Sequence, residues 1–310
     1  MSRLDAEPAR WSPATRQSAR NAERFGIPAA GGLRFVDRTS AEPTGNLASA
    51  ALRWSARLLV VASWASGAIF ATYIIAFFGG AAIGDASQRW NGALPGLYDA
   101  RSPSINLAIG AHFLAGGVLL LLGPIQLIGG VRRAVPWLHR GLGRIYVLSA
   151  GMAGLGGLAF IVGRGTIGGV LMDVGFGLYG ALTVLCATMA YLRARSGRYE
   201  RHRVWAIRLF ALTIGSWLYR MEYGLWSVLF GGLGRGPGFS GWFDAVMVFF
   251  FYAPNLFIAE LFIRAGRNGR GVLANGGAVA LLLSASIFIV IATWMFTASI
   301  WGPRILAPSM

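Results

Sequence analysis

The side chains most able to do chemistry in this sequence are a few ionisable residues inside long apolar runs. Three of them are His112, Arg220 and Glu222. Burying such a group in hydrocarbon is costly, so each is a candidate for function. Arg220 and Glu222 lie two positions apart, and residues at that spacing on a helix point to different sides. Arg220 therefore needs a partner elsewhere: a carboxylate on another helix, a backbone carbonyl, or a ligand with an anionic or carbonyl group.

Several of these residues are predicted to lie at similar depths in the membrane. The helix rise places His112 roughly 10 Å and Arg220 roughly 15 Å below the outer edge of the membrane, with Glu222 slightly shallower. Asp173 and Asp244 begin helices at the same side. We therefore predict an outer polar layer. Its structural alternative is an ion pair between helices, or an Arg220 side chain that extends outward to the headgroups.

Two further histidines, His139 and His202, occur at the inner starts of predicted helices, in the segments HRGLGR (139–144) and ERHRVWAIR (200–208). Basic residues at this depth commonly contact anionic lipid headgroups. The alternative is a haem b with His139 and His202 as axial ligands and arginines beside its propionates. His112 is roughly 20 Å from this level by helix rise and cannot share a metal with them. The inner candidates are His139, Arg140, Arg144, His202, Trp205 and Arg208.

Motifs of known enzymes are missing from the chain. It contains no serine nucleophile elbow, HExxH helix, phosphate loop or catalytic carboxylate pair, so an enzymatic activity is open. The single cysteine, Cys186, excludes an intrachain disulfide and a cysteine metal cluster. Gln126 is a further polar candidate because it follows Pro124 within an apolar run, and the proline frees a backbone carbonyl there.

The elements that must position these residues are membrane-spanning helices. The chain of 310 residues is 55% hydrophobic and only 13% charged, whereas soluble domains carry about 25% charge. A span needs roughly 20 mainly apolar residues, and seven segments qualify. We therefore predict an all-α integral membrane protein. The predicted spans are 58–78, 105–127, 142–163, 170–192, 204–230, 243–263 and 277–301.

The arginines give the orientation. All 28 basic residues are arginine, against 12 acidic residues, and the net charge of +16 would suit nucleic acid if the arginines were clustered on a soluble surface. Instead they alternate between loops, with 22 on one side of the predicted membrane and five on the other. Cytoplasmic loops hold the excess of arginine. We predict a cytoplasmic N-terminus, an outer C-terminus and no nucleic-acid partner.

The ends of the chain differ from the spans. Residues 1–52 are polar and rich in Arg, Ala, Ser and Pro, which predicts a disordered basic tail on the cytoplasmic side. The seven-helix domain then covers 53–304, and 305–310 form a short outer tail. Within the domain, Ala150 with Gly154 and Ala153 with Gly157 are small residues at four-residue spacing, which predicts close helix contacts.

Three segments resemble a known family. The segments HFLAGGVLLLLGPIQL (112–127), HRGLGRIYVLSA (139–150) and HRVWAIRLFALTIGSWLYR (202–220) resemble the bacterial membrane-protein family called domain of unknown function 2306 (DUF2306). The resemblance covers about residues 60–265 and departs at Ala206, where methionine is expected. It implies a location in the bacterial inner membrane. It supports the choice of residues but implies no activity, because the family has none assigned.

Three functions are compatible with these residues. The first is a redox or cofactor-binding membrane protein, with haem at His139 and His202 or a quinone-like carbonyl at His112 and Arg220. The second is a transporter or small-molecule-binding protein, with His112, Arg220 and Glu222 lining a cavity in the outer half. The third is a structural or regulatory partner of another membrane protein.

Overall fold

The chain folds into helices throughout the described part. The structure is a computed structural model that describes residues 43–265 and 272–306. The predicted tail therefore lies outside the described residues up to position 42, as do residues 307–310 of the predicted outer tail. Helix α2 (Pro43–Tyr73) begins inside the segment predicted to be disordered. Proline suits the first turn of a helix and the following segment is rich in alanine, so residues 43–52 are helical instead.

Six helical segments in the described residues are long and apolar enough to cross a membrane. Five agree in position with predicted spans, and the first is longer than predicted because it begins at Ala50 and continues through a π-helical turn, η1 (Ile74–Gly79), into α3 (Gly80–Ile83). The six segments are Ala50–Ile83, Pro103–Leu127, Pro136–Arg164, Gly169–Arg195, Trp242–Arg264 and Gly276–Leu306.

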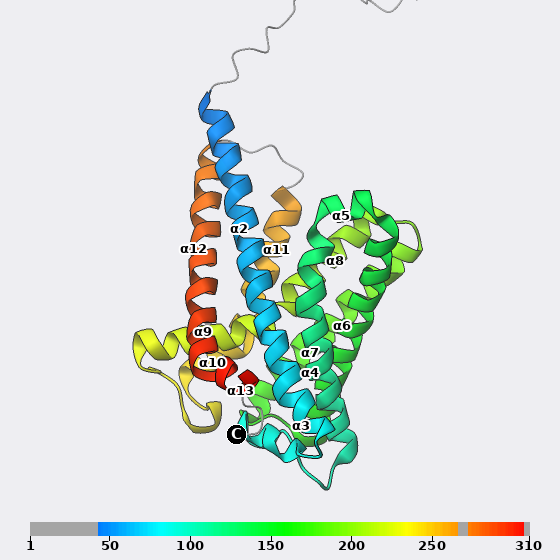
Figure 1. Ribbon diagram of the computed structural model, residues 1–310, viewed down its shortest axis with the longest axis vertical. Helices are drawn as coiled ribbons and strands as arrows, with labels where there is room; N and C mark the ends of the chain where they lie inside the picture. Colours follow the sequence, from blue (N-terminus) through cyan, green and yellow to red (C-terminus); the bar gives the residue numbers. More distant parts are fainter. Residues whose placement is uncertain (1–42, 266–271, 307–310) are drawn as a thin grey trace, which may run out of the picture. The chain divides into compact units, whose positions relative to one another are not determined.

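The predicted fifth span, 204–230, is not one continuous helix. It is divided at Ile214 into α8 (Tyr199–Thr213) and α9 (Gly215–Phe230). Figure 1 shows that α9 runs across α12 at a steep angle, whereas α8 lies closer to the direction of the long helices. A count of seven spans therefore depends on whether α8 and α9 cross the membrane together.

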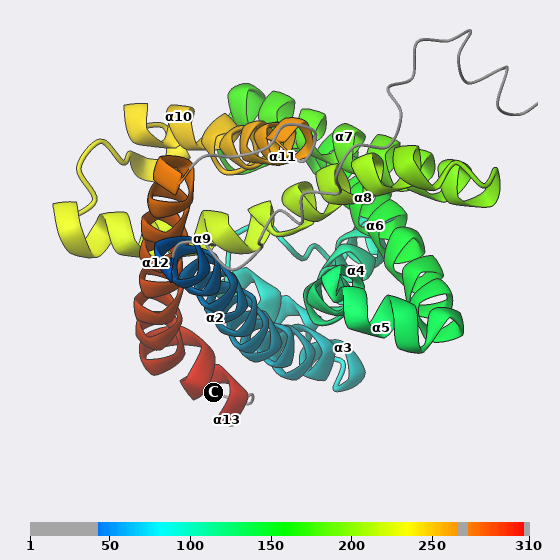
Figure 2. The same ribbon diagram turned by 90° about the horizontal axis from the view of Figure 1, so that it is seen from above.

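Four helices pack in sequence order: α4 (Pro103–Leu127) along α6 (Pro136–Arg164), α6 along α7 (Gly169–Arg195), and α7 along α8. The short α5 (Gly129–Ala134) joins α4 to α6. Viewed along the bundle, this group lies to one side of α2 (Figure 2). Glycines on α6 allow close approach, since a Cβ at Gly154 would lie 3.0 Å from the Gly180 carbonyl oxygen of α7. The predicted packing role of these small residues is confirmed.

The remaining helices surround α9. On one side, α12 (Val272–Phe296) packs against it, and the hydroxyl of Thr293 on α12 donates to Ser66 of α2 at 2.6 Å. On the other side, α10 (Trp242–Phe250) packs on α7 and α11 (Ala253–Ala265) packs on α8. The chain ends in a π-helical turn, η4 (Thr297–Trp301), and α13 (Gly302–Leu306).

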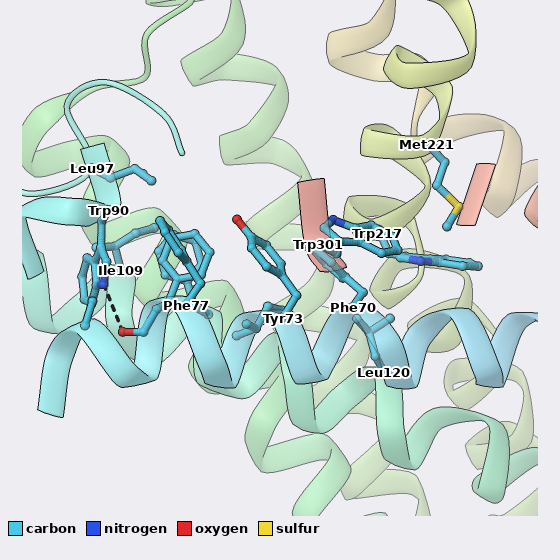
Figure 3. Packing of buried hydrophobic residues seen from close by; sticks show 14 of the residues in the cluster. Phe70, Tyr73, Phe77, Trp90, Leu97, Ile109, Leu120, Trp217, Met221 and Trp301 are labelled. Carbon is cyan, nitrogen blue, oxygen red and sulfur yellow. Dashed lines mark hydrogen bonds between the residues drawn. The ribbon is translucent and has the colours of Figure 1, made fainter. Parts of the chain in front are cut away.

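Aromatic side chains form the core where these helices meet α2. Figure 3 shows Phe70, Tyr73 and Phe77 along α2 and η1, with Trp301 and the α9 residue Trp217 beside them. The rings of Phe70 and Trp301 have centroids 5.0 Å apart. Trp217 is 2% exposed, so α9 is anchored in the bundle interior although it crosses the other helices.

Arginines on the predicted outer side donate hydrogen bonds to the segments that connect the helices. Arg164 donates to the carbonyl oxygens of Gly96 and Leu97 at 3.1 and 3.0 Å. In the same segment, the backbone N–H of Arg101 donates to the Asp99 carboxylate and lowers the pKa of that group. Arg304 donates to the Tyr73 hydroxyl at 3.1 Å. These few outer arginines therefore have structural contacts.

The close contact between α4 and α6 gives a stability prediction. A Cβ at Gly156 would lie 2.5 Å from the Ala108 carbonyl oxygen, whereas a Cβ at Gly151 of the same helix meets nothing within 4 Å. We expect Gly156→Ala to lower the free energy of unfolding in mixed micelles by about 1–3 kcal/mol. Gly151→Ala is the control and should be neutral or stabilising by up to about 1 kcal/mol. Equal effects would contradict the packing argument.

Candidate functional site

Two helix breaks meet in the interior of the bundle. One is the break at Ile214 between α8 and α9, and the other lies at Phe251 and Tyr252, between α10 and α11. A Cβ at Gly215 would lie 3.0 Å from the Phe251 carbonyl oxygen and 3.5 Å from the Tyr252 Cβ. The absence of a side chain at Gly215 thus permits the two breaks to pack directly against each other.

Hydrogen bonds from neighbouring helices satisfy the polar groups at these breaks. The hydroxyl of Tyr179 on α7 donates to the Leu212 carbonyl oxygen at 3.0 Å. The hydroxyls of Tyr146 on α6 and Thr213 on α8 hydrogen bond at 2.6 Å. At the second break, the Asn255 amide donates to the Phe251 carbonyl oxygen at 2.8 Å. Irregular backbone at membrane depth requires such partners, because lipid offers none.

Arg220 lies on α9, six positions after the first break. Its guanidinium donates to the Ser216 carbonyl oxygen on its own helix at 2.6 Å, and its Cζ lies 5.2 Å from the centre of the Phe70 ring on α2. It also interacts electrostatically with the hydroxyl groups of Tyr73, Tyr179 and Tyr219. No described carboxylate forms an ion pair with it. The structure therefore does not supply the interhelical ion pair that was one expectation from the sequence.

His112 lies within electrostatic range of Arg220, as the depth estimate predicted. Its Nδ1 is 2.7 Å from the Ala153 carbonyl oxygen of α6, so Nδ1 carries the proton and Nε2 of the neutral ring is left as an acceptor. A Cβ at Gly157 would lie 3.2 Å from this Nδ1. The glycine on α6 thus gives the imidazole the room it occupies.

Several buried polar atoms lie on α9. The Trp217 Nε1 and the Glu222 Oε2 have no hydrogen-bond partner among the described residues, and the Tyr219 hydroxyl interacts with Tyr223 of the same helix. A buried polar atom without a partner costs about 1–3 kcal/mol. The Tyr219 hydroxyl belongs to the group around Arg220. We use the name central site for Arg220, His112, Tyr73, Tyr179 and Tyr219.

The two aspartates of the predicted outer polar layer bind the loops beside them, and Asp244 also lies within electrostatic range of Tyr219. Asp244 accepts hydrogen bonds from the Tyr223 hydroxyl and from the backbone N–H groups of Gly236 and Gly241, at 2.8, 2.9 and 3.0 Å. Asp173 accepts the Thr166 N–H at 2.6 Å. Both carboxylates hold loops at the starts of helices. Their chain positions beside turns could have indicated this role.

The two inner histidines lie within electrostatic range of each other, and Arg132 and Arg140 are also near His139. His202 Nδ1 donates to the Ala190 carbonyl oxygen at 2.9 Å, which leaves its Nε2 lone pair available. The Nδ1 of His139 is buried without a partner in the described residues. The two residues predicted as haem ligands therefore lie in the same region, within electrostatic range of each other.

The other inner candidates divide between structural and surface positions. Arg208 forms a salt bridge of 2.5 Å with Glu260 on α11, and its Cζ lies 4.8 Å from the ring centre of Trp205. Arg144 lines an apolar pocket of about 740 Å³ between α4, α6 and α7. Gln126, the separate polar candidate, lines a polar pocket beside α5 and the start of α8, and its Nε2 is buried without a partner among the described residues.

Sequence reasoning missed the tyrosines of the central site. Tyr73 and Tyr179 lie on helices far from Arg220 in the chain, and only packing brings them together. Their signal in the sequence was the presence of phenol groups inside apolar spans. Buried tyrosine hydroxyls usually find a hydrogen-bond partner.

Comparison with known proteins places the chain in a family. Residues 109–263, half of the chain, match the family model described as predicted membrane protein (DUF2306). The chain belongs to this family. The match begins in α4, so the resemblance extends over fewer residues than the sequence indicated. It contains both helix breaks, the three histidines and Arg220, whereas Tyr73 of α2 lies outside it. No curated protein and no solved structure matches the chain.

The hydrogen bond at the first helix break can be measured. We expect a double-mutant cycle of Tyr146→Phe and Thr213→Val to give a coupling energy of about 0.5–1.5 kcal/mol in the free energy of unfolding in mixed micelles. Tyr199→Phe is the control because Tyr199 is 71% exposed, and it should have no effect. A coupling energy of zero would show that this bond does not support the break.

Proposed function

We propose that this membrane protein binds a small, membrane-soluble carbonyl compound of the quinone class at the central site. The observation that carries the proposal is the lack of an ion-pair partner for Arg220 among the described carboxylates. A guanidinium has five N–H donors, and one carbonyl oxygen of its own helix accepts only part of that capacity. A carbonyl ligand would supply the missing acceptor.

The aromatic surroundings favour a flat carbonyl compound. Phe70 presents its ring to the guanidinium, and the tyrosines Tyr73, Tyr179 and Tyr219 add further rings and hydroxyl groups. Ligand sites of this kind combine apolar walls with a few polar groups that fix orientation. His112 adds an acceptor nitrogen beside the arginine donors, which suits a ligand that interconverts carbonyl and hydroxyl groups.

The seven-span topology with a cytoplasmic N-terminus is part of the proposal. The connections between α4 and α6 and between α7 and α8 lie at one end of the bundle, together with the end of α11 and the start of α12 (Figure 1). Most of the arginines in the described loops lie at this end, which supports a cytoplasmic assignment. In a bacterial cell the membrane would be the inner membrane.

Substrate transport is the alternative use of the central site. The two helix breaks that meet at Gly215 favour it, because transporters form their sites from discontinuous helices near the middle of the membrane. The sequence-based version of this alternative included Glu222. No described contact joins Glu222 to Arg220, and its partnerless Oε2 is a separate feature. A transporter would move the ligand across the membrane, whereas a redox protein would retain it.

Arg220 provides the test. We expect short-chain ubiquinone to quench the tryptophan fluorescence of the purified protein, and Arg220→Leu to weaken its binding by about 10- to 100-fold, since a hydrogen bond to a charged group contributes about 1.5–3 kcal/mol. Arg220→Lys should weaken it less. Arg195→Leu is the control because Arg195 is exposed at the end of α7.

The stability of the same variants separates ligand binding from a structural role. If Arg220 binds the ligand, Arg220→Leu should melt at nearly the same temperature as the wild type and lose affinity for the quinone. If Arg220 has a structural role, Arg220→Leu should lose several kcal/mol in the free energy of unfolding, as happens when a buried charge pair loses one member. Tyr219→Phe removes a hydroxyl whose described hydrogen-bonding interaction is with Tyr223 of its own helix and joins no second helix, so the variant should largely retain stability and lose affinity. Unchanged quinone affinity in both variants would contradict the proposal.

A haem at the inner end is a second candidate, supported by the proximity of His139 and His202. His202 already donates its second ring nitrogen to a backbone carbonyl, as metal-binding histidines usually do. A bound haem would supply one-electron chemistry. Arg140 lies near His139 and is suited to a propionate.

Absorption spectra test the haem directly. We expect protein purified after haem-supplemented expression to show a Soret band that is lost in His139→Ala and in His202→Ala. His112→Ala is the matched control, and its spectrum should be unchanged because His112 bonds to Ala153 within the α4–α6 pair, away from the inner pair. A wild-type protein without a Soret band would exclude this cofactor.

A further inference from the structure

A polar pocket of about 340 Å³ lies at the inner end of the bundle, apart from the central site. The end of α4, the short helix α5 and the first turn of α8 form its walls. Its volume is at the lower end of the range for small-ligand sites, about 300–1,000 Å³, so it suits a compact polar group. The lining residues are Gln126, Leu127, Gly129, Arg132, Glu200 and Arg203.

The pocket holds charges of both signs that do not neutralise each other directly. Arg132 and Arg203 are cationic, and Glu200 is anionic. No ion pair within 4.0 Å joins these three side chains in the described structure. All three residues are exposed, so a ligand in the pocket would meet charges of both signs, and one with complementary charges would fit best. A simple anion alone would meet repulsion from Glu200.

Gln126 gives an independent indication of a ligand. Its Nε2 is buried and has no hydrogen-bond partner among the described residues, although the side chain lines the pocket. A Cβ at Gly143 would lie 3.4 Å from its Oε1, so the amide is held against α6. An acceptor atom in the pocket would satisfy the N–H groups, and phosphate oxygens are strong acceptors.

We infer that this pocket binds a phosphate ester that carries a primary ammonium group. The phosphate would accept hydrogen bonds from Arg132, Arg203 and the Gln126 amide, and the ammonium group would pair with Glu200. The exposed Leu127 adds an apolar contact at the rim. This chemistry is that of the phosphoethanolamine headgroup of a membrane lipid, or of a free phosphoethanolamine ester. The inference does not depend on the central site.

The experiment uses the full-length protein in nanodiscs or detergent. Native mass spectrometry would count the lipids bound after exposure to phosphatidylethanolamine, phosphatidylcholine or phosphatidylglycerol. We expect about tenfold stronger retention of phosphatidylethanolamine than of the other two, because only it has both a phosphate and an ammonium that donates hydrogen bonds. Soluble glycerophosphoethanolamine distinguishes the sources: strong competition by it indicates a free ester, and weak competition indicates the lipid.

Variants then test the assigned contacts. Glu200→Gln should abolish the preference for phosphatidylethanolamine over phosphatidylglycerol. The double variant Arg132→Gln/Arg203→Gln should weaken retention of both lipids by about tenfold or more. Arg195→Gln removes an exposed charge that does not line the pocket and is the control. Arg203→Lys keeps the positive charge at this position, so it should retain part of the lipid binding that the double variant loses.

Two results would overturn the inference. One is equal retention of the three lipids by the wild type. The other is a loss of binding in Arg195→Gln as large as that in the double variant, which would show general attraction to a basic surface. A variant that melts at a lower temperature than the wild type cannot be interpreted by its lipid binding. In that case the readout is the melting temperature of the wild type with and without glycerophosphoethanolamine. No rise in that temperature, together with equal retention of the three lipids, overturns the inference.

Discussion

The structure depends on satisfying the backbone where α8 ends and α9 begins. A helix that stops within a membrane leaves carbonyl and N–H groups that lipid cannot bind. Here the Tyr179 hydroxyl binds the Leu212 carbonyl oxygen, and the Tyr146 hydroxyl binds Thr213. Because these tyrosines come from α7 and α6, side chains of two other helices support the break. The direction of α9 therefore follows from the packing of helices that precede it in the chain.

The direction of α9 in turn determines the environment of Arg220. A continuous helix would have placed this arginine, six residues after Ile214, about 1.7 turns further along the axis of α8. The break instead carries α9 across the bundle to α2, where Phe70 covers the guanidinium and Tyr73 lies nearby. The central site thus joins the family-matched part of the chain to a helix outside it. Family membership alone does not describe the whole site.

The position of a residue along its helix was predictable from the sequence, whereas the residues that surround it were not. The rise per residue placed His112 and Arg220 at similar depths, and the two residues do interact. Hydropathy identified 204–230 as one span because the apolar second half of α8 runs directly into α9, and the break at Ile214 changes direction within that apolar run. Asp244 was predicted at the outer start of a helix, but the sequence does not show the loop that folds back over it and donates two backbone hydrogen bonds to its carboxylate.

The salt bridge between Arg208 and Glu260 has a mechanical consequence. It ties α8 to α11, which precede and follow the two breaks respectively. The helices on the other side of the breaks, α9 and α10, are held by different neighbours, α12 and α7. Because the two breaks meet at Gly215, α8 and α11 can move only as a pair that turns about this place. A tilt of the pair would leave the ion pair intact and would act first on the backbone at Gly215, five residues before Arg220.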